Sequence, residues 1–499
     1  MILIYLISIL FVGGLVAWLS ERVDPNYPRI VALVTVLIDL VVMISLLGVD
    51  PGSGGWVASV NADWIPRFGI SFYFAADGLS LLLILLTGFL GVIAVGSAWD
   101  DIHEKTGFFY FNLLWTLAGV IGVFTALDLF LFFFFWEVML IPMYFIIAIW
   151  GHENKNYAAM KFFIFTQVTG MLMLVSIIML GYLHFLQMGM LSFNYHDLMK
   201  VEASGTIEYL MMLGFFVAFT TKLPSVPFHS WLPDAHSQAP TAGSVILAGI
   251  LLKTGAYGLI RFAVPLFPES SLDFSPIAMG LAAFSILYCA KVAFAQTDIK
   301  RLIAYTSVSH MGFVTLGVYA WNELALQGAV MTMLAHGLSA AALFMLAGGL
   351  QHRIHTRNMQ HMGGFWEKVP KMAVVAIFFS VAALGMPGLG NFIGEFLALL
   401  GAFQSNILFT VIAAFGLILA SVYSLWVIQQ VFQGEYKTDK FEDSHLLDLN
   451  RREMIYFGAM MIGLIWMGMY PQSFLNLSEP VLIELLNNTQ AVTAAVVRN

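Results

Sequence analysis

The chain is dominated by apolar stretches that are long enough to cross a lipid bilayer. Of its 499 residues, 60% are hydrophobic and only 10% are charged. A helix needs about 20 predominantly apolar residues to span the hydrocarbon core, and runs this continuous exclude a β-barrel, whose strands alternate over about ten residues. We therefore expect an all-α polytopic membrane protein with about 14 transmembrane helices. The expected spans are 2–20, 30–48, 78–98, 108–127, 129–150, 160–185, 207–226, 239–264, 275–296, 299–320, 324–350, 372–402, 408–433 and 452–470.

Basic residues gather in the loops on one side of this predicted bundle. Fifteen of the 22 Lys and Arg residues fall in loops that follow odd-numbered spans, four lie on the opposite side, and Lys222, Lys253 and Lys291 fall inside spans. Because basic loops remain cytoplasmic, we expect both termini to face outward. The first span lacks a basic n-region and a small-residue cleavage site, so we expect it to be retained rather than removed as a signal peptide.

Six ionisable side chains lie inside the apolar spans. Glu137 sits within LFFFFWEVMLIPMYFIIAIW, and Lys222 ends YLMMLGFFVAFTTK just before LPSVP. A charge at the bilayer centre costs about 2.5–3.5 kcal/mol, so such a residue is a functional-site hypothesis by default. Their types and spacing predict a proton path through the membrane. The six candidates are Glu137, Lys222, Lys253, His310, His336 and Glu395.

Each candidate has a structural alternative. Glu137 and Lys222 would otherwise be a salt bridge between helices, although buried pairs add little stability. Lys253 would otherwise snorkel to the surface, but it lies near mid-span. A relay group must be able to lose its proton, which arginine cannot do, so we interpret Arg261 as an anchor at the outer membrane surface. For His310 and His336, a relay role and a core histidine bonded to a neighbouring helix both remain open.

The ionisable residues also indicate an internal repeat. Lys222 and Glu395 each lie beside a Pro- or Gly-interrupted apolar segment, and they are 173 residues apart. The same offset carries Glu137 onto His310. This shift maps spans 4–8 onto spans 9–13, and because five is an odd number, the two halves would have opposite topology. Coincidence among helices of similar length is the alternative.

Metal, cofactor and nucleotide sites find little support in the sequence. Neither the group His229, Asp234, His236 nor the group His352, His355, His361 offers four ligands at the spacing of a zinc site. The single cysteine, Cys289, excludes a Cys-ligated iron–sulfur cluster and an internal disulfide. No phosphate-binding glycine motif occurs in a strand–turn–helix setting. We expect no cofactor, no metal and no nucleic-acid partner, and we interpret Asp128 as a helix N-cap.

Three motifs resemble a known family of membrane subunits. The segments HSWLPDAHSQAPTAGSVILAGILLKTGAYGLIRF (229–262), AQTDIKRLIAYTSVSHMGF (295–313) and GMPGLGNFIGEF (385–396) resemble the antiporter-like subunits of proton-pumping NADH:quinone oxidoreductase, respiratory complex I. The resemblance covers essentially the whole chain, including FFFFWEVMLIPMYF (132–145). The L- and N-type subunits carry lysine where this chain has Glu395, so the resemblance is to the bacterial M-type.

The resemblance implies a fold and a set of roles. It implies fourteen helices with two inverted five-helix repeats, helices 7 and 12 broken, and a polar axis at mid-depth. Glu137 and Lys222 would form a coupled ion pair, Lys253 the central relay and Glu395 the exit-side group, with His310 and His336 on the linking helices. Asp39 and Lys291 lie outside the matched motifs and receive no role. The implied segments are 1–107 (three helices), 108–264 (first repeat), 275–433 (second repeat) and 434–499 (amphipathic loop and last helix).

The function implied is proton translocation in the membrane arm of a bacterial inner-membrane NADH:quinone oxidoreductase. Redox energy released in other subunits would drive it, because moving one charge against 100 mV costs about 2.3 kcal/mol. The expected partners are neighbouring L- and N-type subunits, lipids, water and protons. The alternatives are a subunit of a multi-subunit cation/proton antiporter, a subunit of an energy-converting hydrogenase and a purely structural spacer. Quinone binding by this chain has no supporting motif.

Overall fold

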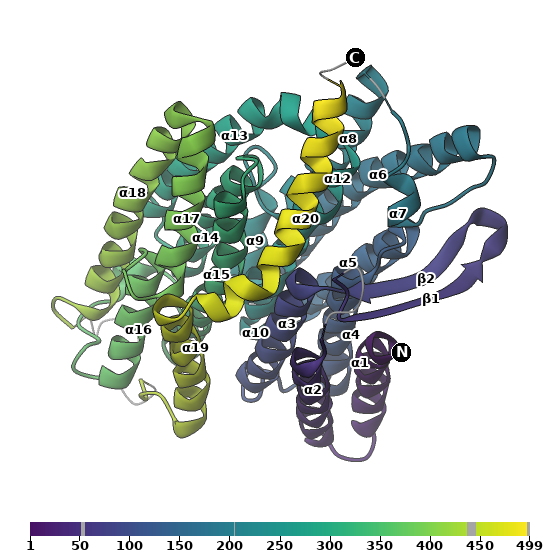
Figure 1. Cartoon of the computed structure of the whole chain (residues 1–499). Coiled ribbons are helices and arrows are strands. Elements are labelled where there is room, and N and C mark those ends of the chain that lie inside the picture. The colour runs from purple at the N-terminus through teal and green to yellow at the C-terminus, as the bar shows by residue number, and fades with distance from the viewer. Residues whose placement is uncertain (51–54, 204, 437–445, 497–499) are drawn as a thin grey trace.

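The computed structural model shows a bundle of long helices with one β-hairpin (Figure 1). It describes residues 1–50, 55–203, 205–436 and 446–496, with side chains to residue 489. The first half contains α1 (Ile2–Ser20), α2 (Tyr27–Ser45), β1 (Ala58–Ile65), β2 (Ile70–Ala76), α3 (Gly78–Ser97), α4 (Thr106–Thr125), α5 (Leu129–Trp150), α6 (Lys155–Met188), α7 (Tyr195–Leu198), α8 (Gly205–Lys222) and α9 (Trp231–Gln238). After them come α10 (Thr241–Ile246), η3 (Leu247–Leu251), α11 (Leu252–Gly258), η4 (Leu259–Ala263), α12 (Val264–Leu266), α13 (Pro268–Phe294), α14 (Ile299–Val318), α15 (Glu323–Ile354), α16 (Pro370–Ala383), α17 (Gly390–Ser405), α18 (Ile407–Phe432), α19 (Arg451–Met469) and α20 (Gln472–Val496).

Ten of the described helices or continuous helical runs are long and apolar enough to cross a membrane. The number becomes eleven if α19 and α20, which meet at a bend of 67°, are taken as one span. Among the expected spans, α8, α14 and the α16–α17 pair fall outside this group. A helical, multi-span protein is therefore confirmed, with a smaller number of clear spans than the sequence predicts.

Two expected spans are interrupted beside an ionisable residue. α8 ends at Lys222, and α9 begins only at Trp231. Between them, the Ser285 hydroxyl of α13 accepts a hydrogen bond from the Val226 amide at 3.0 Å, which satisfies a backbone group that an unbroken helix would have used. In the second half, α16 ends at Ala383 and α17 begins at Gly390. Residues 223–225 of the first interruption are buried, whereas Met386 and Pro387 of the second are exposed.

The same turn occurs at the start of α5 and at the start of α14. Asp128 caps α5 and bridges to Asn194, while Asp298 caps α14 and bridges to Asn358. Each aspartate Oδ1 accepts from the amides two and three residues later, at 3.0 and 3.1 Å for Asp128 and at 2.9 and 3.1 Å for Asp298. The interpretation of Asp128 as an N-cap is confirmed.

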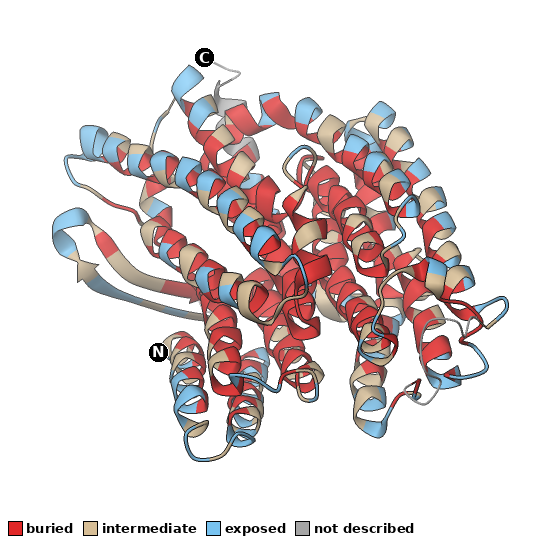
Figure 2. Cartoon of the chain, turned by 180° about the vertical axis from the view of Figure 1, so that it is seen from behind, coloured by how far each residue is buried: buried red, intermediate tan, exposed pale blue. Residues whose placement is uncertain are grey.

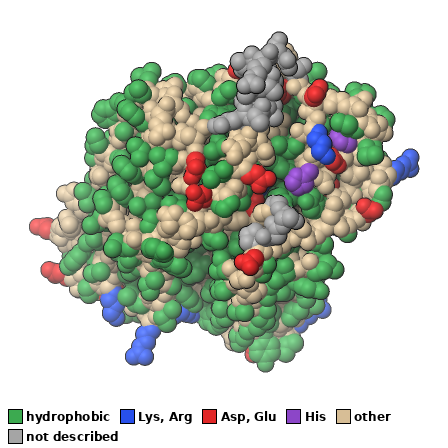
Figure 3. Space-filling view, in the orientation of Figure 1, with side chains coloured by type: hydrophobic (Ala, Val, Ile, Leu, Met, Phe, Trp, Pro, Cys, Tyr) green, Lys and Arg blue, Asp and Glu red, His purple; other side chains and the backbone are tan. Residues whose placement is uncertain are grey.

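The centre of the bundle is its most buried part. In the most apolar 18-residue stretch of the helical run from α10 to α12, every residue is buried. In the corresponding stretch of α15, 94% of the residues are buried (Figure 2). α1, α2, α6, α13 and α18 instead expose apolar faces. The view in Figure 3 shows many hydrophobic side chains and few charged ones, as expected for helices in contact with lipid.

The loops define two faces. On the basic face, residues of loops 99–105, 151–154, 295–298 and 355–369 line one common cavity. The opposite face carries the hairpin β1–β2 and the short helix α7. There the C-terminal helix α20, which the sequence analysis did not predict, crosses the front of the bundle in Figure 1.

Arg261 lies beneath this opposite face, and our interpretation of it as a surface anchor was wrong. Its side chain is 3% exposed and forms an ion pair with Asp77, the N-cap of α3. A guanidinium is stable in such a buried position because the carboxylate supplies both charge and hydrogen bonds.

Candidate functional site

Lys222 lies in an aromatic environment at the end of α8. Its side chain is 1% exposed, and its Nζ lies 5.4 Å from the centre of the Trp136 ring and 5.2 Å from that of Phe162. The ring faces attract a cation. Among the described residues no group accepts a hydrogen bond from this ammonium. Lys222 therefore has no fixed hydrogen-bond partner in this arrangement.

Glu137 faces Lys222 from α5 without direct contact. The two charges are near enough to affect each other electrostatically, and Gln167 of α6 hydrogen-bonds the carboxylate. Neither residue appears among the ion pairs within 4.0 Å that the described part of the chain forms. Gly170 of α6 lies beside the carboxylate, and a Cβ there would come within 3.2 Å of Glu137 Oε1. The two charges therefore interact electrostatically without forming an ion pair within 4.0 Å.

Lys253 is bonded directly to His336. The Lys253 side chain is fully buried, and its Nζ lies 2.9 Å from His336 Nδ1 and 2.5 Å from the Ala248 carbonyl oxygen, to which it donates. The preceding turn, η3, is π-helical, a feature frequently found at functional sites. Gly337 lets α15 lie close to η3, since a Cβ at this position would be only 3.0 Å from the Gly249 carbonyl oxygen.

His310 joins two further polar groups. Its Nδ1 lies 2.6 Å from Glu395 Oε1, and its Nε2 lies 2.9 Å from the Tyr423 hydroxyl. With Glu395 ionised, Nδ1 donates to the carboxylate. Nε2 then accepts from Tyr423 when the ring is neutral and donates to it when the ring is protonated. His310 can gain or lose a proton without breaking either contact.

The two bonded pairs meet at the histidines. The His310 and His336 rings have centroids 5.7 Å apart, which is too far for a direct ring-to-ring hydrogen bond at this geometry. His336 Nε2 and Glu395 Oε2 have no partner among the described residues. One buried cluster therefore consists of Lys253, His336, His310 and Glu395, and no direct hydrogen bond joins its two histidines. A second group consists of Glu137 and Lys222.

His236 is a buried histidine to which sequence reasoning gave no relay role. It is fully buried on α9, stacks on Phe344 at 4.2 Å between ring centroids, and has no hydrogen-bond partner for either nitrogen within the described residues. Electrostatic interactions link it to Lys253, His336 and Lys300. The sequence offered a signal, because His236 precedes a proline at a helix interruption, but we considered it only as a metal ligand.

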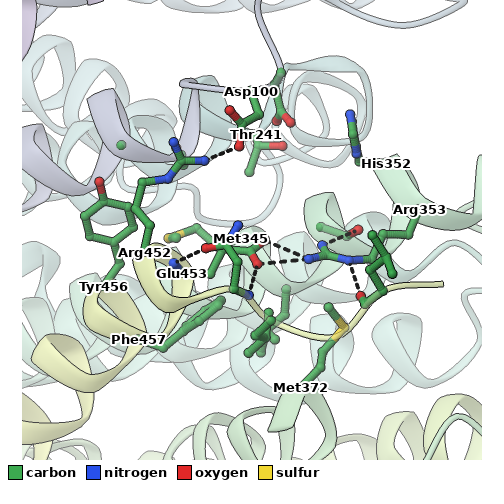
Figure 4. Close-up of a pocket in the computed structure, with 18 of the residues that line it drawn as sticks. Asp100, Thr241, Met345, His352, Arg353, Met372, Arg452, Glu453, Tyr456 and Phe457 are labelled. Atoms are coloured by element: carbon green, nitrogen blue, oxygen red, sulfur yellow. Dashed lines mark hydrogen bonds and ion pairs between the residues drawn. The ribbon is translucent and has the colours of Figure 1, made fainter. Parts of the chain in front are cut away.

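Two cavities open on the basic face near these residues. One of about 540 Å³ lies between α3, α10, α15 and α19 (Figure 4). There Arg452 pairs with Asp100, and Arg353 pairs with Glu453. The second, of about 650 Å³, shares Asp101, Thr241, His352 and His355 with the first.

Titratable loop residues line these cavities. Burial raises the pKa of the Asp101 carboxyl, an effect that the Thr241 hydroxyl and the charges of His352 and Lys300 partly offset. Burial, assisted by Lys300, Arg357 and Lys155, lowers the pKa of His152 to about 4. Lys300 is itself fully buried and donates to the Ala239 carbonyl at 3.3 Å, at the C-terminal end of α9. Polar groups thus extend from the basic face inward to His236.

The suspected metal ligands have other contacts. Asp234 is bound by Lys161 and Arg301, and within the described residues no group of three or more His, Cys, Asp or Glu side chains has a geometry that could hold a metal. Asp39 is 1% exposed inside α2, and its Oδ1 has no partner in the described part of the chain.

A helical membrane bundle with a buried line of lysine, histidine and glutamate is the architecture of an ion-translocating subunit. Residues 126–421 match the family described as NADH:quinone oxidoreductase/Mrp antiporter, TM. The chain is 52% identical to NADH-quinone oxidoreductase subunit M of Escherichia coli (strain K12) over 491 residues, and 52% identical to that of Pseudomonas aeruginosa over 492 residues. Each alignment covers 96% of both chains.

Solved structures agree with this family. A chain of respiratory complex I from Thermus thermophilus superposes with a TM-score of 0.88 at 28% identity, over 98% of this chain and 100% of that one. The protein belongs to the antiporter-like membrane subunits of NADH:quinone oxidoreductase, as an M-type member.

Proposed function

We propose that this chain translocates protons in the membrane arm of a bacterial NADH:quinone oxidoreductase, using the buried cluster of Lys253, His336, His310 and Glu395. The observation that carries the proposal is the pair of direct contacts, Lys253 to His336 and His310 to Glu395, at full burial. Each contact joins groups that exchange a proton, and burying them without such a use is costly. Electron transfer in other subunits supplies the energy.

Protons reach the cluster from the basic face. Asp101 and Thr241 line the cavities there, Lys300 interacts electrostatically with Asp101, and His236 interacts electrostatically with Lys300 and Lys253. Glu395, at the start of α17, is the last member of the cluster in the second half and passes the proton to the opposite face. Water completes the step between the histidines, because buried polar atoms are normally hydrogen-bonded.

The fold behind this path consists of fourteen spans with two inverted repeats, 108–264 and 275–433, preceded by 1–107 and followed by 434–499. The repeated Asp–Asn turn supports the proposal, since Asp128 and Asp298 are 170 residues apart and make the same capping bonds. The interruptions next to Lys222 and before Glu395 also correspond, and these are the broken helices 7 and 12. Both termini lie on the outer side, and L- and N-type subunits are the neighbours.

Reconstitution of the whole complex in sodium-free liposomes tests the function. Replacing Lys253 with Met should abolish most NADH-driven acidification in the assembled enzyme. Replacing Lys291 with Met should not, because Lys291 is an exposed lysine of α13 outside the cluster. Normal acidification by the Lys253→Met complex, or a strict requirement for sodium, would contradict proton transfer through Lys253.

A further inference from the structure

The short helix α9 lacks helical continuity with its neighbours. It comprises Trp231–Gln238, and the non-helical segments 223–230 and 239–240 separate it from α8 and α10. Its position therefore depends on side-chain and loop contacts more than on a continuous backbone. At its C-terminal end, the Gln238 carbonyl accepts from the His152 amide at 2.9 Å.

Asp234 holds α9 between the two halves of the bundle. Its Oδ2 accepts from Lys161 Nζ of α6 at 2.7 Å, and its Oδ1 accepts from Arg301 Nη1 of α14 at 2.5 Å. The carboxylate is 17% exposed, so solvent screens the three charges only partly. Without Asp234, two cations from different halves would face each other across α9 with no negative charge between them.

The same helix touches both groups of ionisable residues. At its start, Trp231 Nε1 donates to the Thr221 carbonyl at 2.9 Å, next to Lys222, and the Trp231 ring packs on Phe162 at 5.2 Å. Phe162 also faces the Lys222 ammonium and directly follows Lys161 in α6. Near its end, α9 carries His236. A displacement of α9 therefore changes the surroundings of Lys222 and of His236 together.

We propose that Asp234 is a positioning residue: its two ion pairs fix α9, and thereby couple the placement of His236 beside Lys253 to the aromatic enclosure of Lys222. The inference rests on the proposed proton path for its consequence, but the placement of α9 is measurable by itself. A residue that only adds stability would give additive losses when combined with a second substitution. An electrostatic positioning residue gives a rescue when a repelling cation is removed.

Hydrogen exchange on the assembled complex tests the placement. Asp234→Asn should raise amide exchange in the peptide covering 229–240 by about tenfold or more, as expected for a local opening. Asp234→Glu should stay near wild type. Lys200→Gln, which breaks an exposed pair with Asp197 on the opposite face, is the control and should leave that peptide unchanged. Unchanged exchange in Asp234→Asn would overturn the proposal.

The rescue distinguishes positioning from general stability. Proton pumping by Asp234→Asn should fall to about a fifth, the fold-change expected for the loss of a partly exposed ion pair. The double variant Asp234→Asn/Lys161→Gln should recover at least half of the wild-type rate. If Asp234→Asn fails to assemble, the double variant should restore assembly. A double variant no better than Asp234→Asn would overturn the coupling, whereas normal pumping by Lys253→Met would overturn the proton path and leave the exchange result intact.

Discussion

The two ends of the buried path differ in how their ionisable groups are held. Near Lys222, the charges of Glu137 and Lys222 face each other without a hydrogen bond, and aromatic rings surround the ammonium. Near Glu395, both nitrogens of His310 are bonded, one to the carboxylate and one to Tyr423. One end has a charge pair whose separation can change, and the other has a fixed set of contacts.

This difference assigns different tasks to the two halves. The attraction between two charges that are not hydrogen-bonded changes steeply with a small movement in a medium of low dielectric constant. A histidine bonded on both sides instead passes a proton while its neighbours stay in place. In the proposed path, the Lys222 end receives the drive from the rest of the complex, and the Glu395 end releases protons.

The largest effect on proton pumping is expected at the Lys222 end. Lys222→Ala or Glu137→Gln should abolish most proton pumping and the coupled NADH oxidation, because a proton-transfer group typically contributes a factor of about 10²–10⁴. The complex should still assemble, since Lys222 Nζ has no hydrogen-bond partner among the described residues and glutamine at position 137 can keep the bond to Gln167. Purified variants in liposomes provide the measurement. Near-normal pumping by assembled Lys222→Ala would remove the assignment of this end.

A second large effect is expected at Lys253, which is bonded to His336. Lys253→Arg keeps the positive charge but should be strongly defective, because a guanidinium does not release its proton at accessible pH. The shape also matters, since Lys253 Nζ donates to the Ala248 carbonyl at 2.5 Å and has no room for a larger group. Acidification rates in liposomes test this. Equal rates for Lys253→Arg and wild type would mean that Lys253 is only a fixed charge.

Much of the molecule could be predicted from its sequence because bilayer physics leaves strong signals. The apolar runs placed most helices, and the cost of mid-membrane charge pointed to six candidate residues whose roles stay predictions. The structure places Lys253, His336, His310 and Glu395 in one cluster. The direct pairing of His310 with Glu395 was beyond sequence reasoning, since contacts between residues 85 positions apart depend on tertiary packing.

The failures of the sequence analysis have physical causes. α20 is less apolar than a spanning helix and lies across the bundle, so a search for spans missed it. Arg261 was taken for a surface residue because its partner Asp77 lies 184 residues away in the chain. Tyr423 lies in an apolar helix where a tyrosine is unremarkable, and only the fold brings its hydroxyl to His310.

The two ends differ in how much space a side chain would find at a glycine position. A Cβ on Gly394 would lie 2.5 Å from the Thr332 amide nitrogen, which belongs to the backbone of α15 and cannot rotate away. Gly394→Ala should therefore displace α17 and reduce pumping severalfold, at an overpacking cost of about 1–3 kcal/mol. Gly170→Ala should cost far less stability, because its Cβ would meet the movable Glu137 carboxylate at 3.2 Å and Trp136 Nε1 at an ordinary 3.6 Å. Equal defects in the two variants would contradict the difference in packing between the Glu395 end and the Lys222 end.

The smallest effect is expected from the hydroxyl that completes the fixed end. Tyr423→Phe removes the 2.9 Å contact to His310 Nε2 and leaves Glu395 as the only hydrogen-bond partner of the ring among the described residues. A lost hydrogen bond of about 0.5–1.5 kcal/mol corresponds to a two- to tenfold change, so we expect pumping to fall by about two- to fivefold without loss of assembly. Tyr319→Phe is the matched control, because Tyr319 is equally buried and its hydroxyl has no partner among the described residues. If both tyrosine variants lose the same activity, the defect comes from removing a buried hydroxyl in general, and His310 does not depend on Tyr423. If only Tyr423→Phe is defective, the second bond to the imidazole is part of how this end keeps its geometry while a proton passes.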